Sequence, residues 1–281
     1  MSTLSGYLRA VGAIGPGFND WTSLRRQLTG APTAVHTATV IPVPARLPPA
    51  ERRRVGKVVK LALATGLQTC EAVGADPATL TSVFVSSGGD GENCHTICET
   101  LASDDRLISP TRFHNSVNNA ASGYWGIATG AQRPSTIVSA YDGSFGAGLI
   151  ESLAQLAAGD GDGDGDGDGD GDGVLMIGYD TPYPSPLREA RPMADAMGIG
   201  LLLSRHPTDD ALARLSLSLG DERLTPMRDA DLEHLRQSIP TARALPLLMA
   251  IARVIEGKGH QRTVLEHLPG AHALIDVHPA S

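Results

Sequence analysis

The chain has 281 residues and a formal net charge of −8; 41% of its residues are hydrophobic and only 4% are aromatic. This length and composition predict one large domain or two small ones, with a core of mainly aliphatic side chains. Seven of the acidic residues lie in one Asp-Gly tract, so the rest of the chain carries −8 + 7 = −1. A nearly neutral body gives no support for a protein that binds nucleic acid or an anionic membrane.

The chain contains three cysteines, Cys70, Cys94 and Cys98. A sparse, odd count favours a reducing compartment over a disulfide scaffold. Cys94 and Cys98 lie beside His95, but no second Cys/His pair follows at zinc-ligand spacing, so we interpret them as two incidental thiols and predict no metal site and no cofactor. Because no signal-peptide-like run and no apolar stretch of about 20 residues occurs, we expect a cytoplasmic protein without a membrane span.

Hydrophobic periodicity predicts strands that alternate with helices along the first two thirds of the chain. The expected strands are Leu4–Ile14, Ser82–Ser86, Thr136–Ala140, Val174–Ile177, Met197–Leu203, Ala211–Leu219 and Ala273–Val277. The expected helices are Trp21–Leu28, Pro49 to about Val73, Glu92–Ala102, one within Thr111–Gly130 after a cap at Ser116 or Asn118, one after the turn Tyr141–Ser144 with Phe145, Leu149, Ile150, Leu153 and Leu156 on one side, Asp229–Gln237 and Ala242–Glu256. This order indicates an α/β layered sandwich with a mixed sheet, as a single domain over residues 1–281.

The stretch around residues 134–180 has a βαβ pattern with a tight turn between the first strand and the helix. The helix begins with Gly143, Gly146 and Gly148, each of which costs up to about 1 kcal/mol relative to Ala. In an exposed helix nothing offsets that cost. In a helix pressed against neighbouring backbone, glycine offsets it by allowing the close approach. We therefore predict a buried helix whose N-terminus faces a pocket or an interface.

The Asp-Gly tract, residues 159–173, alternates glycine with aspartate throughout. Half glycine and half like-charged carboxylate, it is expected to be a disordered insertion within the domain. Calcium binding is the alternative, but the additional ligands and the closing Glu of calcium loops are missing.

Several segments together resemble a known family. They are LPPAERRRVGKVVKLAL from Leu47, SPTRFHNSVNNAASGYWGIATG from Ser109, STIVSAYDGSFGAGLIESL from Ser135 and VLMIGYDTPYP from Val174. The chain resembles the N-terminal half of β-ketoacyl synthases of the thiolase superfamily, and more closely the short chain-length-factor-like subunits of aryl polyene and xanthomonadin-type pigment pathways. The resemblance implies a thiolase-like layered sandwich: a single half, with a mixed sheet and helices on both faces.

In this family a nucleophilic Cys occupies the turn between a strand and a buried helix, where the helix N-terminus lowers the pKa of the thiol. The resemblance puts the family's T-A-C-S-type motif on Ser139, Ala140 and Tyr141. The Cys position is then Tyr141, or Asp142 if the register slips by one, with Ser144 nearby. The family's HGTGT and NSFGFGG segments, which carry its two histidines, do not occur. The resemblance therefore implies a subunit with no catalytic residues for condensation.

What remains of the family's function is the dimer surface. In the superfamily the strand before the turn pairs with its mate across the dimer, which here is Thr136–Ala140, and the small-residue helix Asn115–Gly130 packs beside it. We expect a heterodimer with an active ketosynthase, or a homodimer. The expected interface or tunnel residues are Phe113, Asn115, Asn118, Tyr124, Trp125, Ser139, Tyr141 and Phe145. Plain core packing is an equal alternative for the aromatic members.

Other functions stay open. One alternative is a homodimer that holds an acyl group, or that binds an acyl carrier protein through the basic cluster Arg52–Arg54, Lys57 and Lys60, although a solvated helix face explains those charges too. A residual acyltransferase or hydrolase would use Ser144, or Cys94 or Cys98, as nucleophile. The histidines available to such an enzyme are His95, His114, His260, His267, His272 and His278.

Overall fold

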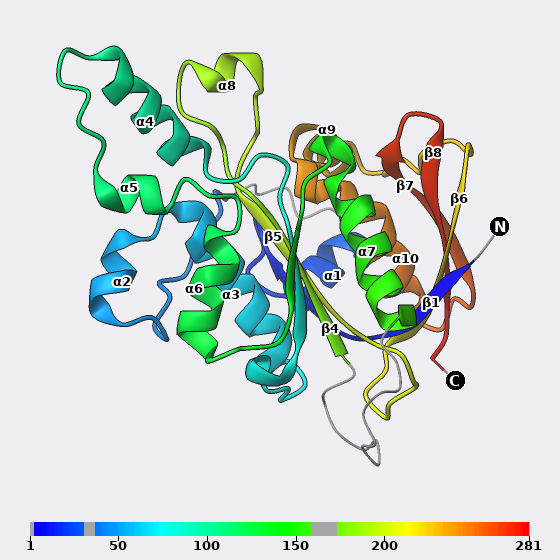
Figure 1. The fold of residues 1–281 in the computed structure, drawn as a ribbon. Helices are drawn as coiled ribbons and strands as arrows, with labels where there is room; N and C mark the ends of the chain where they lie inside the picture. Colours follow the sequence, from blue (N-terminus) through cyan, green and yellow to red (C-terminus); the bar gives the residue numbers. More distant parts are fainter. Residues whose placement is uncertain (1–2, 31–36, 159–172, 281) are drawn as a thin grey trace.

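The computed structural model describes residues 3–30, 37–158 and 173–280, and within them eight strands form one sheet (Figure 1). The strands are β1 (Leu4–Ile14), β2 (Thr81–Val85), β3 (Ser135–Val138), β4 (Gly173–Asp180), β5 (Met197–Ser204), β6 (Ala213–Gly220), β7 (Gln261–Leu268) and β8 (Ala271–His278). They lie in the order β3-β2-β4-β5-β1-β6-β8-β7. β2 is parallel to β3 and to β4, and the remaining pairs are antiparallel. The predicted mixed sheet is confirmed.

Helices cover both faces of this sheet (Figure 1). They are α1 (Trp21–Thr29), α2 (Pro49–Arg54), α3 (Lys57–Glu71), α4 (Gly91–Ala102), α5 (Pro110–His114), α6 (Ala120–Thr129), α7 (Ser144–Ala158), α8 (Leu187–Ala190), α9 (Ala230–Ser238) and α10 (Leu245–Ile255). Side chains of α3 and α6 share one buried cluster with β2, β4 and β5. Side chains of α1, α7, α9 and α10 form the second cluster on the opposite face. The arrangement is the predicted layered α/β sandwich.

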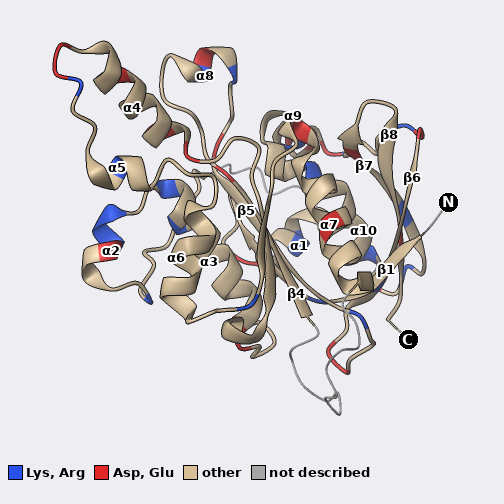
Figure 2. Cartoon of the chain, viewed as in Figure 1, with Lys and Arg blue, Asp and Glu red and all other residues tan. Residues whose placement is uncertain are grey.

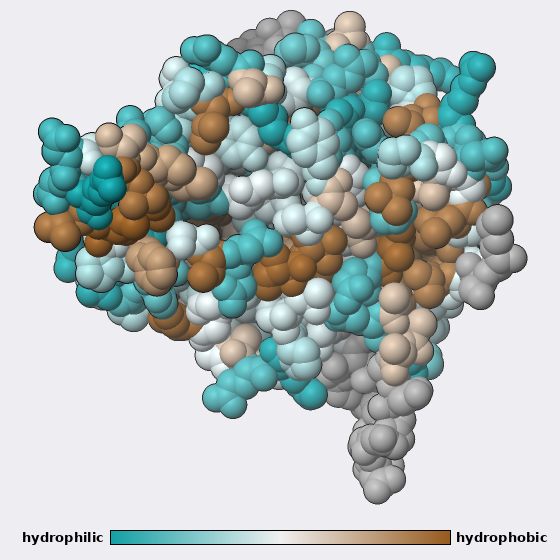
Figure 3. Space-filling view, turned by 45° about the horizontal axis from the view of Figure 1, so that its top comes forward, coloured by the Kyte–Doolittle hydropathy of each residue, from teal (hydrophilic) through white to brown (hydrophobic). Residues whose placement is uncertain are grey.

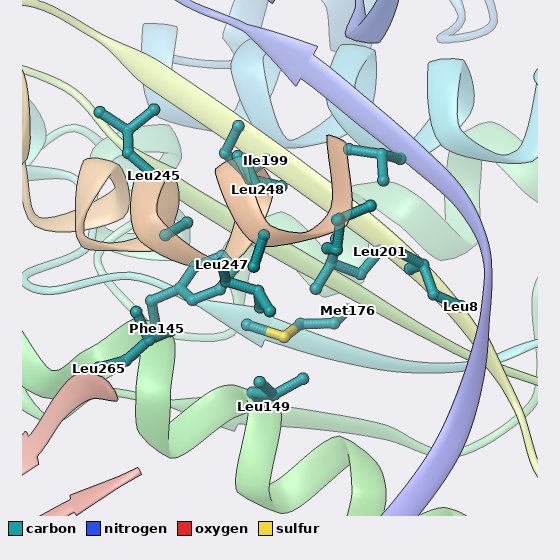
Figure 4. Close-up of a cluster of buried hydrophobic side chains, with 14 of the residues drawn as sticks. Leu8, Phe145, Leu149, Met176, Ile199, Leu201, Leu245, Leu247, Leu248 and Leu265 are labelled. Atoms are coloured by element: carbon teal, nitrogen blue, oxygen red, sulfur yellow. The ribbon is translucent and has the colours of Figure 1, made fainter. Parts of the chain in front are cut away.

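The core beneath α7 is mostly aliphatic, as the composition predicts (Figure 4). Leu149 of α7, Met176 of β4 and Leu201 of β5 are each 0% exposed, and α10 adds Leu247 and Leu248. Burying one such side chain contributes about 1.5–3 kcal/mol relative to leaving it in water. This cluster fixes α7 against the sheet and so positions the turn at its N-terminus.

The glycines at the start of α7 mark a close contact with β7. A methyl group at Gly143 would overlap the carbonyl oxygen of His267, and one at Gly146 would overlap that of Glu266. Backbone atoms of β7 therefore lie where a side chain would otherwise stand. This close approach explains why α7 carries glycines despite their cost in a helix, as the sequence predicted.

Two of the predicted helices are interrupted. The helix expected from Pro49 to about Val73 is split into α2 and α3 because Val55 is extended, with φ −80° and ψ 136°, and Gly56 becomes the N-cap of α3. Within Thr111–Gly130, α5 ends at His114 and α6 begins at Ala120 after Asn119. The predicted cap at Ser116 or Asn118 was therefore wrong by one to three residues.

Strand β7 was not predicted. It runs along one edge of the sheet, and a bulge between Leu265 and Leu268 interrupts its pairing with β8, so its sequence lacks a clean alternation. At the opposite edge, β3 ends at Val138 rather than Ala140. The Asp-Gly tract lies outside the described residues, except for Gly173, which belongs to β4 and pairs with Ser204.

Candidate functional site at the strand–helix turn

The turn between β3 and α7 is built around Tyr141. Residues Tyr141–Gly143 form one 3₁₀ turn, and Tyr141 has φ 53°, the one positive φ of a non-glycine residue in the described ranges. A bulky residue in the left-handed region costs about 1–2 kcal/mol, so surrounding contacts must hold it there. The Ala140 N–H donates to Ser144 Oγ at 2.9 Å, and Ser144 Oγ donates to the Tyr141 carbonyl at 2.6 Å. Ser144 thus closes the turn.

Two arginines from distant segments close the site from outside. The Arg191 guanidinium carbon lies 3.5 Å from the centroid of the Tyr141 ring, and Arg191 Nη2 donates to Asp142 Oδ1 at 2.9 Å. Arg243 Nη2 reaches Asp142 Oδ2 at 3.3 Å, and its Nε lies 3.4 Å from Glu266 Oε2. Beside them is a small hollow of about 180 Å³. Stacked and paired charges therefore line the turn while the Tyr141 ring stays largely exposed, and the hollow beside it is smaller than a usual ligand pocket.

The aromatic residues expected at an interface or tunnel divide into two groups. Tyr141 is 65% exposed and Phe113 is 69% exposed, whereas Tyr124, Trp125 and Phe145 are at most 3% exposed. Trp125 packs edge-on to Phe84 on the α3 face of the sheet, at 6.1 Å between centroids. Phe145 lies on the other face, in the α7 cluster. The chain therefore does not bring these aromatics together into one wall.

The polar residues of the same set hold loops in place. Asn115 is buried: its Nδ2 donates to the Arg54 carbonyl at 3.0 Å, and its Oδ1 accepts from the Tyr124 hydroxyl at 3.0 Å. Ser139 Oγ donates to the Ser86 carbonyl at 2.8 Å and lies 3.4 Å from Asn118 Nδ2. The Asn115 contacts join the end of α5 to α2 and α6, and the Ser139 contacts join the segment before the turn to the residue after β2 and to the α5–α6 loop.

Asp180 at the end of β4 is a buried group that the sequence analysis did not single out. Its Oδ1 accepts from the Ser87 N–H at 2.9 Å and the Ser87 hydroxyl at 2.8 Å, and its Oδ2 accepts from the Thr241 hydroxyl at 2.7 Å. Burial raises the pKa of this carboxyl, and the hydrogen bonds partly oppose that shift. The signal was present, since an Asp closes the apolar run GVLMIGYD, but its partners lie about 60 and 90 residues away.

The structure gives little support to an acyltransferase or hydrolase that uses Ser144, Cys94 or Cys98. Ser144 is 2% exposed, and its hydroxyl is engaged with Ala140 and Tyr141. Burial, followed by the neighbouring Cys98, raises the pKa of the Cys94 thiol, which is the opposite of what a nucleophile needs. His95 Nε2 lies 3.2 Å from Glu99. Of the late histidines, His267 approaches the turn through its backbone, because its carbonyl oxygen lies where a methyl group at Gly143 would stand.

Within the described ranges no cluster of three or more His, Cys, Asp or Glu is arranged to hold a metal ion. None of the described helices is both long and apolar enough to cross a bilayer.

Known proteins resemble this chain in sequence pattern and in fold. The family model for the β-ketoacyl synthase N-terminal domain matches residues 21–253. No curated protein matches the sequence. A chain of the ketosynthase–chain length factor complex from Xenorhabdus doucetiae is 22% identical, with a TM-score of 0.70 over 97% of this chain and 99% of that one.

Two further solved structures have the same fold. A chain of the ishigamide ketosynthase/chain length factor is 13% identical, with a TM-score of 0.69 over 98% of this chain and 99% of that one. A chain of a type II polyketide ketosynthase complexed with its acyl carrier protein is 12% identical, with a TM-score of 0.73 over 99% of this chain and 100% of that one. The mixed sheet between two helical layers is thus a ketosynthase-type, thiolase-like fold. By its sequence match over most of its length, the chain belongs to the β-ketoacyl synthase N-terminal domain family.

Proposed function

We propose that this chain is a non-condensing, chain-length-factor-like subunit that pairs with an active β-ketoacyl synthase. The observation that carries the proposal is Tyr141, which has φ 53° at the turn into α7. A strained strand-to-helix turn is the geometry that presents a nucleophile in other enzymes. Here the strained residue is a phenol, stacked under Arg191, and it cannot form the thioester that acyl transfer to a ketosynthase requires.

The open edge of the sheet supports pairing with another chain. β3 is the terminal strand and is hydrogen-bonded to β2 on one side. An unpaired edge strand is a template for pairing with another chain. Next to it, Phe113, Val117 and Ile127 are 69%, 52% and 52% exposed and border a shallow apolar hollow of about 650 Å³. Figure 3 shows hydrophobic surface at its left end, where α4 and α5 lie in Figure 1.

The occupant we propose for this edge is a ketosynthase subunit, and the product is of the aryl polyene or xanthomonadin type. Two of the structural neighbours are titled as ketosynthases together with a chain length factor. The family motifs in the segments from Leu47 and Ser109 support the pigment-pathway assignment. A second copy of this chain is the alternative partner, and the test below distinguishes the two.

The test is co-expression of the chain with the ketosynthase encoded nearest to it, followed by size-exclusion chromatography. We expect co-elution at 1:1, and we expect Phe113→Asp with Ile127→Asp to separate the two proteins. The matched control is Leu268→Asp, a similarly exposed apolar residue (51%) on β7, which should leave the complex intact. Two independent peaks for the wild-type pair would overturn the proposal, and a homodimer peak alone would favour the alternative.

Acyl loading tests the second claim, that the chain has no condensing activity of its own. Incubated alone with malonyl- and acyl-carrier donors, the purified chain should show no covalent acyl mass. Tyr141→Cys supplies a thiol at the turn but no histidine pair, so it should become acylated at most and should not condense two acyl units. Condensation by the unmodified chain would refute the assignment.

Binding of an acyl carrier protein is a second candidate function, favoured by one feature. A hollow of about 460 Å³ where α2 meets α3 is lined by five basic side chains, Arg53, Arg54, Lys57, Lys60 and Arg112, against two acidic ones, Asp90 and Glu92. Figure 2 shows basic segments gathered around α2. Carrier proteins are acidic, so complementarity would speed and orient their encounter with this surface.

Titration with an acidic carrier protein at two salt concentrations tests this candidate. Lys57→Glu with Lys60→Glu should weaken binding at least tenfold and flatten its salt dependence. Arg25→Glu with Arg26→Glu, on α1 at the opposite face of the sheet, is the matched control and should change little. Equal effects of both pairs would argue against a docking surface at α2 and α3.

A further inference from the structure

Helix α4 carries two thiols that the proposed function does not use. Cys94 and Cys98 are both exposed and free, and they are separated by one helical turn. Residues four apart on a helix lie one above the other on the same face. Cys98 is near enough to Cys94 to contribute, after burial, to the raised pKa of the Cys94 thiol. In Figure 1 this helix stands at the margin of the molecule, away from the sheet.

Helical geometry keeps this pair from closing into a disulfide. A disulfide needs Cβ atoms about 3.5–4.5 Å apart, whereas residues one helical turn apart have Cβ atoms about 5–6 Å apart. The two sulfurs therefore stay as thiols while α4 is intact. A single bridging atom relieves the mismatch, because two bonds of about 2.3 Å at a pyramidal centre hold the sulfurs about 3.5 Å apart, against about 2.05 Å in a disulfide.

No third ligand is in place beside the two sulfurs. His95 follows Cys94 directly and so points about 100° around the helix from it. Its Nε2 lies 3.2 Å from Glu99 Oε1. Across residues 3–30, 37–158 and 173–280, no group of three or more metal-ligating side chains was found. Structural zinc sites have four ligands, so the two sulfurs alone do not form one.

We propose that Cys94 and Cys98 form a dithiol site for thiophilic centres that are satisfied by two sulfur ligands, trivalent organoarsenicals being the class that fits. An arsenoxide condenses with both thiols: two S–H and the As–O bonds break, two S–As bonds form, and the oxygen leaves with both protons as water. Arsenic is neither oxidised nor reduced. The product is a staple across one turn of α4.

The staple would stiffen the first turns of α4, which are hydrogen-bonded to α5. Asn93, next to Cys94, donates from Nδ2 to the Arg112 carbonyl at 2.9 Å, and Asp90 caps the helix through the Asn93 N–H at 3.0 Å. Closing Cys94 onto Cys98 restricts this turn in the bound state. Amide exchange of α4 should therefore slow on binding, while exchange of α10 on the far side of the sheet should not change.

The test uses phenylarsine oxide and the full chain. We expect one equivalent to bind by intact mass, two reactive thiols to disappear, and the adduct to resist excess mercaptoethanol but to be reversed by dimercaptopropanol. Cys94→Ser and Cys98→Ser should each abolish this resistance. Cys70→Ala should preserve it, because Cys70 is 1% exposed and burial raises the pKa of its thiol to about 12.

A register variant separates chelation from the mere presence of two thiols. Cys98→Ser combined with Glu99→Cys keeps two exposed thiols but rotates the second away from the face of Cys94. We expect at least a tenfold weaker adduct, with circular dichroism unchanged. Equal resistance in the register variant, or an adduct of the wild-type chain that mercaptoethanol removes, would overturn the proposal.

Discussion

Helices α7 and α3 both pack tightly on the sheet, yet their N-termini meet opposite surroundings. At α7 the turn is closed by its own Ser144, the Tyr141 ring and two arginines on Asp142. At α3 the N-cap is Gly56, which has no side chain to cap the helix, and the end faces the basic hollow of about 460 Å³. A helix N-terminus favours anions, and at α3 the Asp90 carboxylate already lies beside Gly56, at the wall of this hollow.

Under the proposed function, these two helix ends divide structure from interaction. The turn at Tyr141 is filled with paired charges, and the open features are surfaces: the β3 edge, the apolar hollow beside α6 and the basic hollow at α3. Substitutions at the closed end, which is the turn before α7, should therefore act on stability. Substitutions at the open end, which is the N-terminus of α3, should act on binding. The following predictions test this division.

The largest effect is expected from Gly146→Val, because any side chain there meets the Glu266 carbonyl. Backbone of β7 would have to move, and we expect a loss of about 3 kcal/mol in the free energy of unfolding. Urea denaturation measures it. Gly123→Ala on α6 is the control: nothing lies within 4 Å of the added methyl, so stability should rise by up to about 1 kcal/mol. Equal effects of the two changes would contradict the close packing of α7.

Next in size is Arg191→Ala. It removes the stack on Tyr141 and one of the two guanidinium partners of Asp142, from a side chain that is 17% exposed. We expect a loss of about 2 kcal/mol, since cation–π contacts and charge-assisted hydrogen bonds each contribute about 1–2 kcal/mol in such sites. Arg191→Lys keeps the ion pair but not the planar stack and should lose about half as much. No loss in either variant would mean that Tyr141 is held without Arg191.

A smaller, pH-dependent effect is expected from Glu233→Gln on α9, which leads into the segment lining the hollow by Tyr141. The hydrogen bond from Arg236 is the main cause that lowers the pKa of Glu233 to about 2. Its side chain is 21% exposed, so screening reduces the benefit to about 1 kcal/mol at pH 7. A lowered pKa contributes stability above the unfolded value of about 4.3, and that stability is lost as the pH falls toward 2.

Denaturation of wild type and Glu233→Gln at pH 7, 4 and 2.5 measures this difference. The gap between the two proteins should be full at pH 7 and should narrow below about pH 4. A gap that stays constant with pH would assign the effect to packing and not to charge.

The smallest effect on stability is expected from Lys57→Gln with Lys60→Gln at the open end. The Lys57 side chain is 70% exposed, and its ion pair with Glu92 spans 3.6 Å at the surface. Such pairs contribute about 0–1 kcal/mol, so the free energy of unfolding should change by less than about 0.5 kcal/mol. A loss above about 1.5 kcal/mol would show that these lysines belong to the structural framework.

Much of the architecture followed from local patterns. Val174–Ile177 is continuously apolar because β4 is buried on both faces, and the glycines of α7 indicated the close contact found with β7. Strand β7 was missed, because an edge strand with a bulge and half-exposed residues has no clear period. The break between α2 and α3 was missed too, since Val55 and Gly56 interrupt a run whose hydrophobic period otherwise continues.

The sequence by itself determined the fold class, the family and the presence of Tyr141 and Asp142 at the turn, because these depend on residue type and on short-range spacing. Only the tertiary structure decided which aromatics are exposed, since Tyr141 and Phe113 do not differ in kind from the buried Tyr124 and Phe145. It also brought Arg191 and Arg243 to Asp142 from 49 and 101 residues away. Contacts across such separations depend on how the strands are ordered in the sheet, and no local pattern encodes that order.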